Sequence, residues 1–592
     1  MTKLICTDTL NFFLYDVFQA EKIFELERFK DYDKASVDLF FQSIKDIGDK
    51  DLYPIYTKMD KEKAFYKDGV VYVLPELGQA VKAIAESGII GAMDSFENGG
   101  IQLPYCITNA ALSILYAANP NATPYATLTQ GSANLIAAFG NQSLKDTFLE
   151  NMYSWKWQGT MALTEPEAGS SLSDIVTEAT PLSDGSYSIK GQKIYISAGD
   201  HNQTENIVHL LLARIKGAPA GTKGISLFVV PKYRPENDQL EDNDVITSGI
   251  YGKMGQKGYT AAHLMFGEHN NCKGFLVGEA NKGLSYMFQM MNEARIGTGT
   301  LSMATASAAY YKSLQYAKER IQGSHPDKKG TQVPIIEHAD VRRMLLSQKA
   351  FIEGSIGLIS YCSLLKDLSE FGPEEDRKNK HLLLELLTPV VKSYCAEQGF
   401  QSVNLAMQVL GGAGYTDDFP IEQYLRDTRV NSIYEGTTTI HGMDLLGRKI
   451  MMEEGLALKL FQNEVQQTLE KAMQLEETKA MAMELGIQLK GFEKVLNNHF
   501  DILKTKGPRH FLADATLVLE LFGLLTVAWI WLKALIKLHS SDSLQTDAFK
   551  TSKTTTAKYF FDYELVKATG LVQKLSKSTD VLTSSIDASI FD

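Results

Sequence analysis

The sequence predicts a mainly α-helical protein with one central β domain and an added helical domain at its C-terminal end. In residues 36–157 apolar side chains recur three and four positions apart, the period of helices that face a core. In residues 158–279 short segments rich in Val, Ile and Leu follow one another without helices between them. From residue 280 onward the helical period returns over long segments joined by short turns, as in a helical bundle.

The composition is that of an ordinary globular protein. The chain has 592 residues, of which 44% are hydrophobic and 22% charged, enough for several domains. A formal net charge of -12 argues against nucleic acid as a partner, because phosphate binding needs clustered Lys and Arg. The five cysteines are scattered, without a C-x-x-C pair or nearby histidines, which argues against a disulfide scaffold or a zinc motif. We expect no metal and a reducing, cytoplasmic location.

The first 157 residues are expected to form a short arm and a helical domain. Residues 1–35 carry apolar side chains that could dock as a helix, and Asp8 and Asp16 interrupt the apolar core that a signal peptide would need. Residues 36–157 are helical by their apolar period and are punctuated by prolines.

Residues 158–279 are expected to form a small antiparallel barrel or sandwich. Residues 187–191 and 192–197 alternate in the manner of two strands joined by a turn at Gly191. Further short strands are expected at 207–215, 224–231, 245–252, 261–266 and 274–278. Strands at this spacing, with no helices between them, are typical of such domains.

The rest of the chain is predicted to be helical in two parts. Residues 280–450 form an up-and-down bundle with helical segments at 283–291, 296–320, 340–368 and 382–410 and turns at 323–330 and 372–373. Residues 451–592 form the added domain, with 16 Lys and Arg against 18 Asp and Glu. Its uncharged segment 521–532 is shorter than the about twenty residues of a membrane span, so we expect a buried helix there. The polar residues 540–556 are expected to form a loop.

Three motifs carry residues that packing alone does not require. M-A-L-T-E-P-E-A-G-S-S (161–171) offers hydroxyls and amides to a planar ring or a phosphate, although a Pro/Gly turn explains it too. In K-I-Y-I-S-A-G (193–199), Tyr195 and Ser197 share one strand face, as they would in a cofactor site or in an ordinary strand. In Q-V-L-G-G-A-G-Y (408–415) the paired glycines allow close approach of a phosphate or form a helix C-cap.

A fourth motif, V-N-S-I-Y-E-G-T-T-T-I-H-G (430–442), sets the carboxylate of Glu435 between an aromatic ring and a glycine. Apolar neighbours remove water from a carboxylate and raise its pKa above the usual value of about 4.3. Such a group suits a general base that must deprotonate a carbon acid. A helix start, with Glu435 on the dipole of the turn that follows, explains the same residues.

Taken together, these motifs resemble the acyl-CoA dehydrogenase family. T-E-P-E-A-G-S-S, K-I-Y-I-S-A-G, M-M-N-E-A-R (290–295), Y-A-K-E-R (316–320), Q-V-L-G-G-A-G-Y and I-Y-E-G-T occur in the family's order within residues 36–450. The N-terminal arm and the added domain are similar to the family's longer branch, which includes the 3-methylmercaptopropionyl-CoA dehydrogenases. The resemblance implies an N-terminal helical domain, a β domain and a bundle that carries the catalytic base, followed by the added domain.

The resemblance also implies an FAD cofactor and a role for each matching residue. The residues that match cofactor contacts are Met161, Leu163, Thr164, Gly169, Ser170, Tyr195, Ser197, Arg320, Gln408, Gly411, Gly412, Thr437 and Thr439. The residues expected near the acyl-CoA are Ser170, Asn292, Arg295, Tyr434 and Gly436. The arginine that matches Arg320 reaches the FAD of a neighbouring subunit in the family, which implies a homodimer or a homotetramer.

The implied reaction is α,β-dehydrogenation of an acyl-CoA to a trans-2-enoyl-CoA, as in fatty-acid β-oxidation. Glu435 would remove the α proton while a hydride leaves the β carbon for flavin N5. Some family members carry the base just before the residue that matches Arg295; here that position is Ala294, and Glu293, one residue away, is an alternative. An electron-transfer flavoprotein is implied as the acceptor; an acyl-CoA oxidase that uses oxygen is an alternative. A DNA-associated alkylation-response flavoprotein is a further alternative, disfavoured by the balanced charge of the added domain.

The sequence departs from the family pattern at four places. Ser171 stands where many members have Asp, and His441 replaces a common Gln. Residues 321–323 lack the usual aromatic after Arg320, and residues 253–259 differ from the longer branch. These departures concern cofactor contacts and the surroundings of the thioester.

Overall fold

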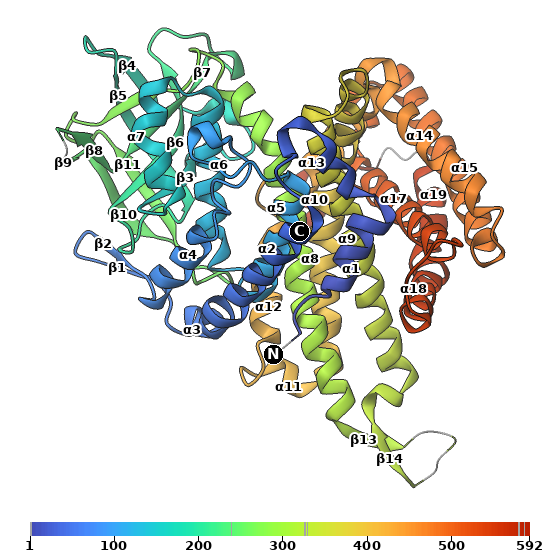
Figure 1. Ribbon diagram of the computed structural model, residues 1–592. Helices are drawn as coiled ribbons and strands as arrows, with labels where there is room; N and C mark the ends of the chain where they lie inside the picture. Colours follow the sequence, from blue (N-terminus) through green and yellow to red (C-terminus); the bar gives the residue numbers. More distant parts are fainter. Residues whose placement is uncertain (1–2, 238, 325–326, 328–329, 578–580, 585) are drawn as a thin grey trace. The chain divides into compact units, whose positions relative to one another are not determined.

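The computed structural model describes residues 3–237, 239–324, 327, 330–577, 581–584 and 586–592, without the side chains of 288–290. It divides into two compact units. The first consists mainly of Phe24–Ala294 with Leu425–Asp427, and the second of Ile5–Ile23, Arg295–Tyr424 and Thr428–Asp592. Each unit is described by itself (Figure 1).

The helices of the first unit follow the predicted apolar period. They are α2 (Lys34–Ile47), α3 (Tyr56–Lys61), α4 (Glu76–Glu86), α5 (Tyr105–Ala118), α6 (Thr123–Phe139) and α7 (Gln142–Tyr153). Helix α2 begins at a capping box: Asp33 Oδ1 accepts from the Ser36 N–H at 2.7 Å, and Ser36 Oγ accepts from the Asp33 N–H at 3.0 Å. All 14 residues of α5 are buried, so this helix lies at the centre of the helical part of the unit.

The main β structure of the first unit is an eight-stranded sheet, beside the small hairpins of β1 (Phe65–Lys67) with β2 (Val70–Tyr72) and of β8 (Tyr233–Glu236) with β9 (Gln239–Asp242). Its strands are β3 (Trp157–Ala162), β4 (Glu178–Pro181), β5 (Tyr187–Ser197), β6 (Asn206–Ile215), β7 (Ile225–Pro231), β10 (Val245–Ile250), β11 (Ala261–Phe266) and β12 (Lys273–Leu276). The order is β10-β11-β5-β12-β7-β6-β3, and β4 pairs with both β5 and β6. Strands β5, β12, β7, β6 and β4 therefore close into a ring of pairings, as in a small barrel.

The expectation of a purely antiparallel domain was wrong for two of these pairs. Strand β6 runs parallel to β3 and to β4, whereas its pairing with β7 is antiparallel. The chain between β3 and β6 is long enough to return to the same end of the sheet, which parallel pairing requires.

The expected turn at Gly191 was also wrong, because β5 runs through it without a break from Tyr187 to Ser197. Gly191 has φ +157, still an extended backbone, and a Cβ there would lie 2.5 Å from Thr177 Oγ1. The glycine is needed for close approach of a neighbouring segment within the sheet.

Three long helices form the bundle of the second unit. Helix α8 (Gly283–Glu319) is continuous over both segments that the sequence predicts, and it enters this unit at Arg295. Helix α9 (Ala339–Phe371) and helix α10 (Glu374–Leu410) meet at the predicted turn, where Gly372 ends one and Pro373 precedes the other. Between α8 and α9 lies a hairpin of β13 (Ile321–Ser324) and β14 (Gln332–Pro334), and residues 325–326 and 328–329 of the predicted turn lie outside the described residues.

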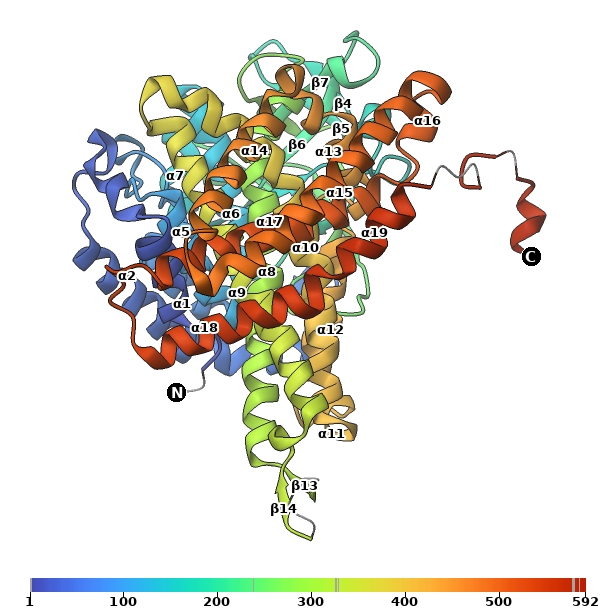
Figure 2. The same ribbon diagram turned by 90° about the vertical axis from the view of Figure 1, so that its right-hand side faces the viewer.

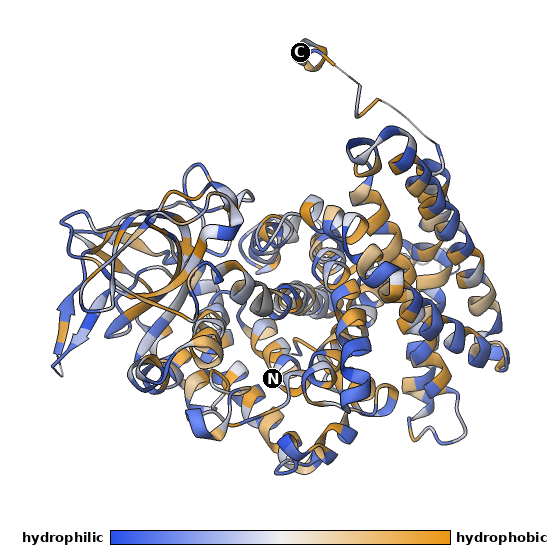
Figure 3. Ribbon diagram, turned by 90° about the horizontal axis from the view of Figure 1, so that it is seen from above, coloured by the Kyte–Doolittle hydropathy of each residue, from blue (hydrophilic) through white to orange (hydrophobic). Residues whose placement is uncertain are grey.

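The added C-terminal helices lie in the same unit as the bundle. They are α14 (Met452–Ala472), α15 (Glu476–Lys506), α17 (Ala515–Leu538), α18 (Asp547–Tyr559) and α19 (Lys567–Leu575). The helices of the structure carry both hydrophobic and hydrophilic residues (Figure 3), as helices with one buried face do. Helix α17 is long and apolar enough to cross a membrane, but 83% of its most apolar 18-residue window is buried in the structure. The predicted buried helix over 521–532 is therefore confirmed, and it is longer than expected.

The expected loop over 540–556 was wrong, because α18 occupies most of it. Thr546 caps the helix by accepting from the Phe549 N–H at 3.3 Å. Lys553 is buried and donates to Glu353 Oε1 of α9 and to Thr9 Oγ1, each at 2.6 Å. These contacts are distant in sequence, so the polar composition of the segment could not reveal them.

The N-terminal segment Ile5–Ile23 packs within the second unit. It forms α1 (Thr7–Asn11) and the π-helical turn η1 (Phe12–Val17), which lie beside α9 and α17 (Figure 1). Phe12 meets Phe549 of α18 with ring centroids 5.3 Å apart. The segment docks through its apolar side chains, as the sequence predicts.

Substitution of Gly357 by Leu is expected to destabilise the second unit. A Cβ at Gly357 would lie 2.5 Å from Phe13 Cε1 and from Ile530 Cγ2. Overpacking costs about 1–3 kcal/mol, more than the roughly 1 kcal/mol regained when a helical glycine is replaced. Denaturant unfolding would measure the loss in the free energy of unfolding. Gly486→Leu is the matched control, since no heavy atom lies within 4 Å of a Cβ at Gly486 in α15, and it should not be destabilising.

Candidate active site

Glu435 lies in a tight turn that ends at helix α13 (Thr438–Gly447). Its φ is +55, a left-handed conformation that is rare for a residue with a side chain, and Gly436 follows at φ +84. Thr437 caps α13 by accepting from the Ile440 N–H at 3.4 Å, so Glu435 precedes the helix and is not part of its first turn. Strain of this kind is stored at functional sites when the surroundings enforce it.

Two buried side chains hold the carbonyl groups of this turn. His441 Nε2 lies 3.0 Å from the Glu435 carbonyl oxygen, and Lys392 Nζ donates to the Gly436 carbonyl oxygen at 2.6 Å. The backbone N–H of Glu435 donates to no group among the described residues. In this turn the carbonyl oxygens of Glu435 and Gly436 are therefore bonded, while the Glu435 N–H stays available.

Burial and two positive charges act in opposite directions on the carboxylate of Glu435. Surrounding protein removes water from the carboxylate and raises the pKa of Glu435, while the positive charges of Lys392 and Arg295 lower it. The residue keeps an exposed surface, so the raise is smaller than full burial would give. Arg295 is buried and its Nη1 lies 3.3 Å from Asp444 Oδ2.

In the first unit, the end of β3 and strand β5 bring one set of predicted residues together. The Ile194 N–H donates to the Thr164 carbonyl oxygen at 2.9 Å. Thr164 is half-buried, as are Met161 and Leu163. Tyr195 is 58% exposed and sits at φ +58, where the register of β5 against β11 shifts. Two apolar side chains, an open aromatic ring and the hydroxyls of Thr164 and Ser197 are suited to a planar polar ring.

A buried ion pair holds these two elements, and the sequence analysis missed it. Lys193 Nζ donates to Glu165 Oε1 at 2.7 Å and to the Leu163 carbonyl oxygen at 2.9 Å. The two side chains are 0% and 2% exposed. Glu165 also accepts from Thr177 Oγ1 at 2.5 Å and from the Val176 N–H at 2.6 Å. The sequence signal for this ion pair was a residue of opposite charge in each motif, Glu165 in 161–171 and Lys193 in 193–199.

A third set gathers at one end of the second unit. Arg320 directly follows α8, and its Nη2 donates to Gln322 Oε1 at 3.0 Å. The short α11 (Gly412–Tyr415) follows α10 at the same end of the long helices (Figure 2), and Tyr316 of α8 meets Phe419 with ring centroids 5.5 Å apart. The predicted contacts at this end are all exposed: Arg320, Gln408, Gly411 and Gly412. Gly411 ends α10 with φ +60, so the C-cap explanation also holds for it.

The remaining predicted residues take varied positions. Gly169, Ser170 and Thr439 are exposed, Tyr434 is half-buried and Asn292 is buried in α8. The alternative base Glu293 lies in the first unit, where its carbonyl oxygen accepts from Tyr105 Oη at 3.3 Å. Glu435 and Arg295 both lie in the second unit.

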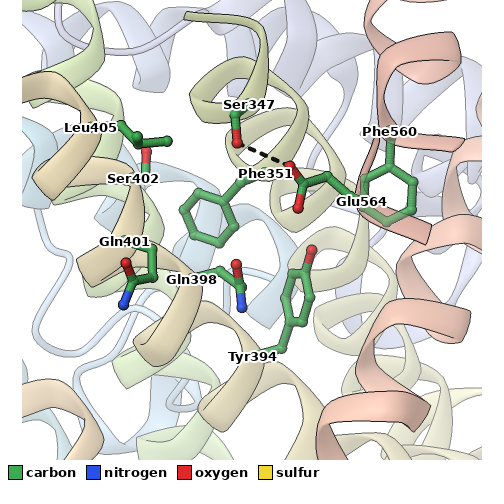
Figure 4. Close-up of a pocket in the computed structure, with 9 residues that line it drawn as sticks. All are labelled: Ser347, Phe351, Tyr394, Gln398, Gln401, Ser402, Leu405, Phe560 and Glu564. Carbon is green, nitrogen blue, oxygen red and sulfur yellow. Dashed lines mark hydrogen bonds between the residues drawn. The ribbon is translucent and has the colours of Figure 1, made fainter. Parts of the chain in front are cut away.

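A separate cavity in the second unit is too small for an acyl-CoA. It lies between α9, α10 and the π-helical turn η12 (Phe560–Leu565), as Figure 4 shows. Its volume is about 20 Å³, room for about one water, whereas ligand pockets hold roughly 300–1,000 Å³. Ser347 Oγ donates to Glu564 Oε1 across it at 3.0 Å, which ties η12 to the bundle.

Comparison with known proteins decides the family. The model "Acyl-CoA dehydrogenase, middle domain" matches residues 160–269, and "Acyl-CoA dehydrogenase, C-terminal domain" matches 281–451. A 3-methylmercaptopropionyl-CoA dehydrogenase of Ruegeria pomeroyi is 34% identical over 572 residues, which cover 95% of this chain and 96% of that protein. The chain belongs to the acyl-CoA dehydrogenase family. A butyryl-CoA dehydrogenase of Syntrophomonas wolfei is 34% identical over 468 residues, 76% of each chain.

Solved structures agree on the acyl-CoA dehydrogenase fold, including the added domain. An acyl-CoA dehydrogenase of Bacillus anthracis complexed with FAD has a TM-score of 0.76 at 20% identity and covers 95% of this chain and 92% of its own. ACDH-11 of Caenorhabditis elegans, in complex with C11-CoA, has a TM-score of 0.74 at 20% identity and covers 89% of this chain and 85% of its own. The model "Acetyl-CoA dehydrogenase C-terminal like" matches residues 461–585.

These comparisons confirm the predicted family, fold and enzyme class. The protein is a flavin-dependent oxidoreductase of the acyl-CoA dehydrogenase type. The extra C-terminal domain that marks the longer branch is also confirmed. The roles of single residues and the identity of the acyl group go beyond these comparisons.

Proposed function

We propose that this acyl-CoA dehydrogenase oxidises an acyl-CoA to a trans-2-enoyl-CoA with Glu435 as the base. The observation that carries the proposal is the left-handed turn at Glu435, whose carboxylate lies near two cations and whose backbone N–H has no partner in the part of the chain that the structure describes. A proton acceptor and an oxyanion donor at one residue are what removal of a proton next to a thioester requires.

The residues present fit an FAD group. In the first unit, Met161, Leu163 and Tyr195 would contact the flavin ring, and Thr164 and Ser197 would offer it hydrogen bonds. In the second unit, no heavy atom lies within 4 Å of a Cβ built on Gly411 or Gly412, so the open backbone there can accept the adenosine part. Arg320 would neutralise pyrophosphate charge. The remaining predicted contacts, Gly169, Ser170, Gln408, Thr437 and Thr439, are proposed on the family resemblance.

The chain's own part in the reaction is a proton transfer. The Glu435 carboxylate would take the proton α to the thioester carbonyl and become a neutral carboxylic acid. The Glu435 N–H would donate to the carbonyl oxygen as negative charge develops on it. Bound FAD supplies the acceptor for the hydride that leaves the β carbon. Ser170, Asn292, Arg295, Tyr434 and Gly436 are proposed to line the path of the acyl-CoA.

The proposal extends to acceptor, assembly and location. An electron-transfer flavoprotein would reoxidise the enzyme, and subunits would pair as a homodimer or a homotetramer so that Arg320 serves a neighbour's FAD. A cytoplasmic location fits five scattered cysteines that are all free thiols in the structure.

Anaerobic titration with acyl-CoAs of increasing chain length tests the reaction. The FAD-loaded protein is expected to lose its oxidised-flavin absorbance with at least one saturated thioester, and product analysis should show the 2-enoyl-CoA. Colour that returns with an electron-transfer flavoprotein but only slowly with oxygen supports a dehydrogenase. Rapid return with oxygen would make the enzyme an oxidase, and no bleaching with any thioester would refute the proposed reaction.

A further inference from the structure

A lysine lies in the middle of the buried part of α10. Lys392 is 0% exposed, within a stretch of α10 that is buried almost throughout. Its Nζ donates to the Gly436 carbonyl oxygen at 2.6 Å. Burial lowers the pKa of Lys392 to about 8, although Glu435 and Glu397 raise it. Burial of an ammonium group is costly unless its charge is used, so the position calls for an explanation.

A histidine holds the preceding carbonyl of the same turn. His441 of α13 is 0% exposed, and its Nε2 lies 3.0 Å from the Glu435 carbonyl oxygen. Because a carbonyl oxygen only accepts, Nε2 carries the ring proton. Burial, Arg295 and Lys392 lower the pKa of His441, so the ring is neutral. Its Nδ1 is buried and has no partner among the described residues.

We infer that Lys392 and His441 are positioning residues for the catalytic base, which hold the left-handed turn at Glu435 through its two consecutive carbonyl oxygens. The inference rests on the proposed role of Glu435. A left-handed conformation of a residue with a side chain is strained. A charge-assisted hydrogen bond to the Gly436 oxygen and a second bond to the Glu435 oxygen oppose this strain. With both carbonyl groups held, the Glu435 N–H is fixed in place and left free.

The charge of Lys392 has a second consequence for Glu435. The charged or titratable groups on the packed elements are Arg295 from α8, Glu397 and Lys392 from α10, and His441 and Asp444 from α13. Asp444 neutralises Arg295 at 3.3 Å and lies 2.7 Å from Arg448 Nε. Lys392 donates to a neutral carbonyl oxygen, so its positive charge is less compensated than that of Arg295. Loss of this charge makes the carboxylate of Glu435 harder to form.

The test compares Lys392→Met and Lys392→Arg with the full-length, FAD-loaded wild type. The measurement is the rate of flavin reduction by a substrate acyl-CoA, followed as kcat/KM against pH. The base must be ionised, so the rate rises with pH through the pKa of Glu435. Lys392→Met is expected to move this acidic limb up by about one pH unit, the lower end of the effect of a nearby opposite charge. Lys392→Arg should leave the limb where it is.

Lys533→Met is the matched control, because Lys533 is a half-buried lysine of the same unit paired with Glu464 at 3.1 Å. It should keep the wild-type limb. The second arm compares His441→Gln, which can still donate to the Glu435 oxygen, with His441→Leu, which cannot. His441→Leu is expected to slow flavin reduction by up to about 100-fold, the effect of misplacing a catalytic group.

The outcomes separate the inference from the function on which it rests. If no acyl-CoA reduces the wild type, the proposed function fails. If the wild type is reduced but Lys392→Met keeps its acidic limb, or His441→Leu matches His441→Gln, the positioning role is refuted. Should Lys392→Met not retain FAD, the two His441 variants decide the matter alone.

Discussion

Glu435→Gln is expected to bind FAD and acyl-CoA normally and to lose flavin reduction by at least about 10²–10⁴-fold, the usual contribution of a general base. The amide has nearly the same shape as the carboxylate but cannot accept the α proton. The Lys392 and His441 bonds reach only backbone oxygens of the turn, so the turn itself should persist. Rapid-mixing absorbance under anaerobic conditions measures the loss.

Two other carboxylates provide the controls. Glu397→Gln removes the negative charge of the carboxylate that accepts from the Thr438 hydroxyl and should reduce the rate far less than Glu435→Gln. Glu293→Gln tests the alternative base and should remain active. If the flavin of Glu435→Gln is reduced at the wild-type rate and Glu293→Gln is inactive, the base is Glu293 of α8 and not Glu435.

Lys193→Met is expected to lower the free energy of unfolding of the protein by about 3–5 kcal/mol, the cost of breaking a buried ion pair from one side. Glu165 would stay buried without its cation, and the Leu163 carbonyl oxygen would lose its donor. Denaturant unfolding and FAD retention would measure the two effects. Lys190→Met is the control: Lys190 is exposed on the same strand, and its Nζ only donates to Asn270 at 3.2 Å.

Lys193→Met should also reverse the pH dependence of the stability that Glu165 contributes. Burial raises the pKa of Glu165, but Lys193, Thr177 and Val176 together bring it below its ordinary value. A lowered pKa contributes stability above the unfolded value of about 4.3 that is lost as the pH falls through the folded value. Without Lys193 burial should dominate and raise the pKa, so the contribution of Glu165 should decline as the pH rises from about 4 to 7. An unchanged slope in that window would contradict the pairing.

The fold was largely readable from the sequence because periodicity reports which face of an element is buried. The long helices α9 and α10, the strands of the β domain and the buried α17 follow from it. Helix α18 did not, because what stabilises it is the ion pair of Lys553 with Glu353, 200 positions earlier. The prediction of a turn at Gly191 was wrong for a related reason. The sequence alone does not distinguish a glycine that allows close approach to Thr177 from a glycine in a turn.

For the site, the sequence predicts Glu435 as the base, but it does not reveal the side chains that hold the turn at Glu435. Glu435 stands in a recognisable motif, whereas Lys392 is one lysine in an apolar stretch and precedes it by 43 positions in a different helix. The left-handed backbone at Glu435 was also unreadable, since Gly436 next to it appeared to be the residue with conformational freedom. Contacts across helices decide both, and a linear pattern does not contain them.

The N-terminal segment has a consequence for the order in which the protein is made. Ile5–Ile23 is synthesised before α17 and α18, yet it contacts both: Phe12 meets Phe549, Thr9 accepts from Lys553, and Asp16 accepts from Gln545 at 2.9 Å. During synthesis its aromatic residues have to wait for more than 500 residues before their partners exist. A chain that ends before α18 would lack the partners of this apolar segment, and Glu353 would keep its ion pair with Lys349 but lose the one with Lys553. We therefore expect incomplete chains to expose apolar side chains to chaperones and proteases.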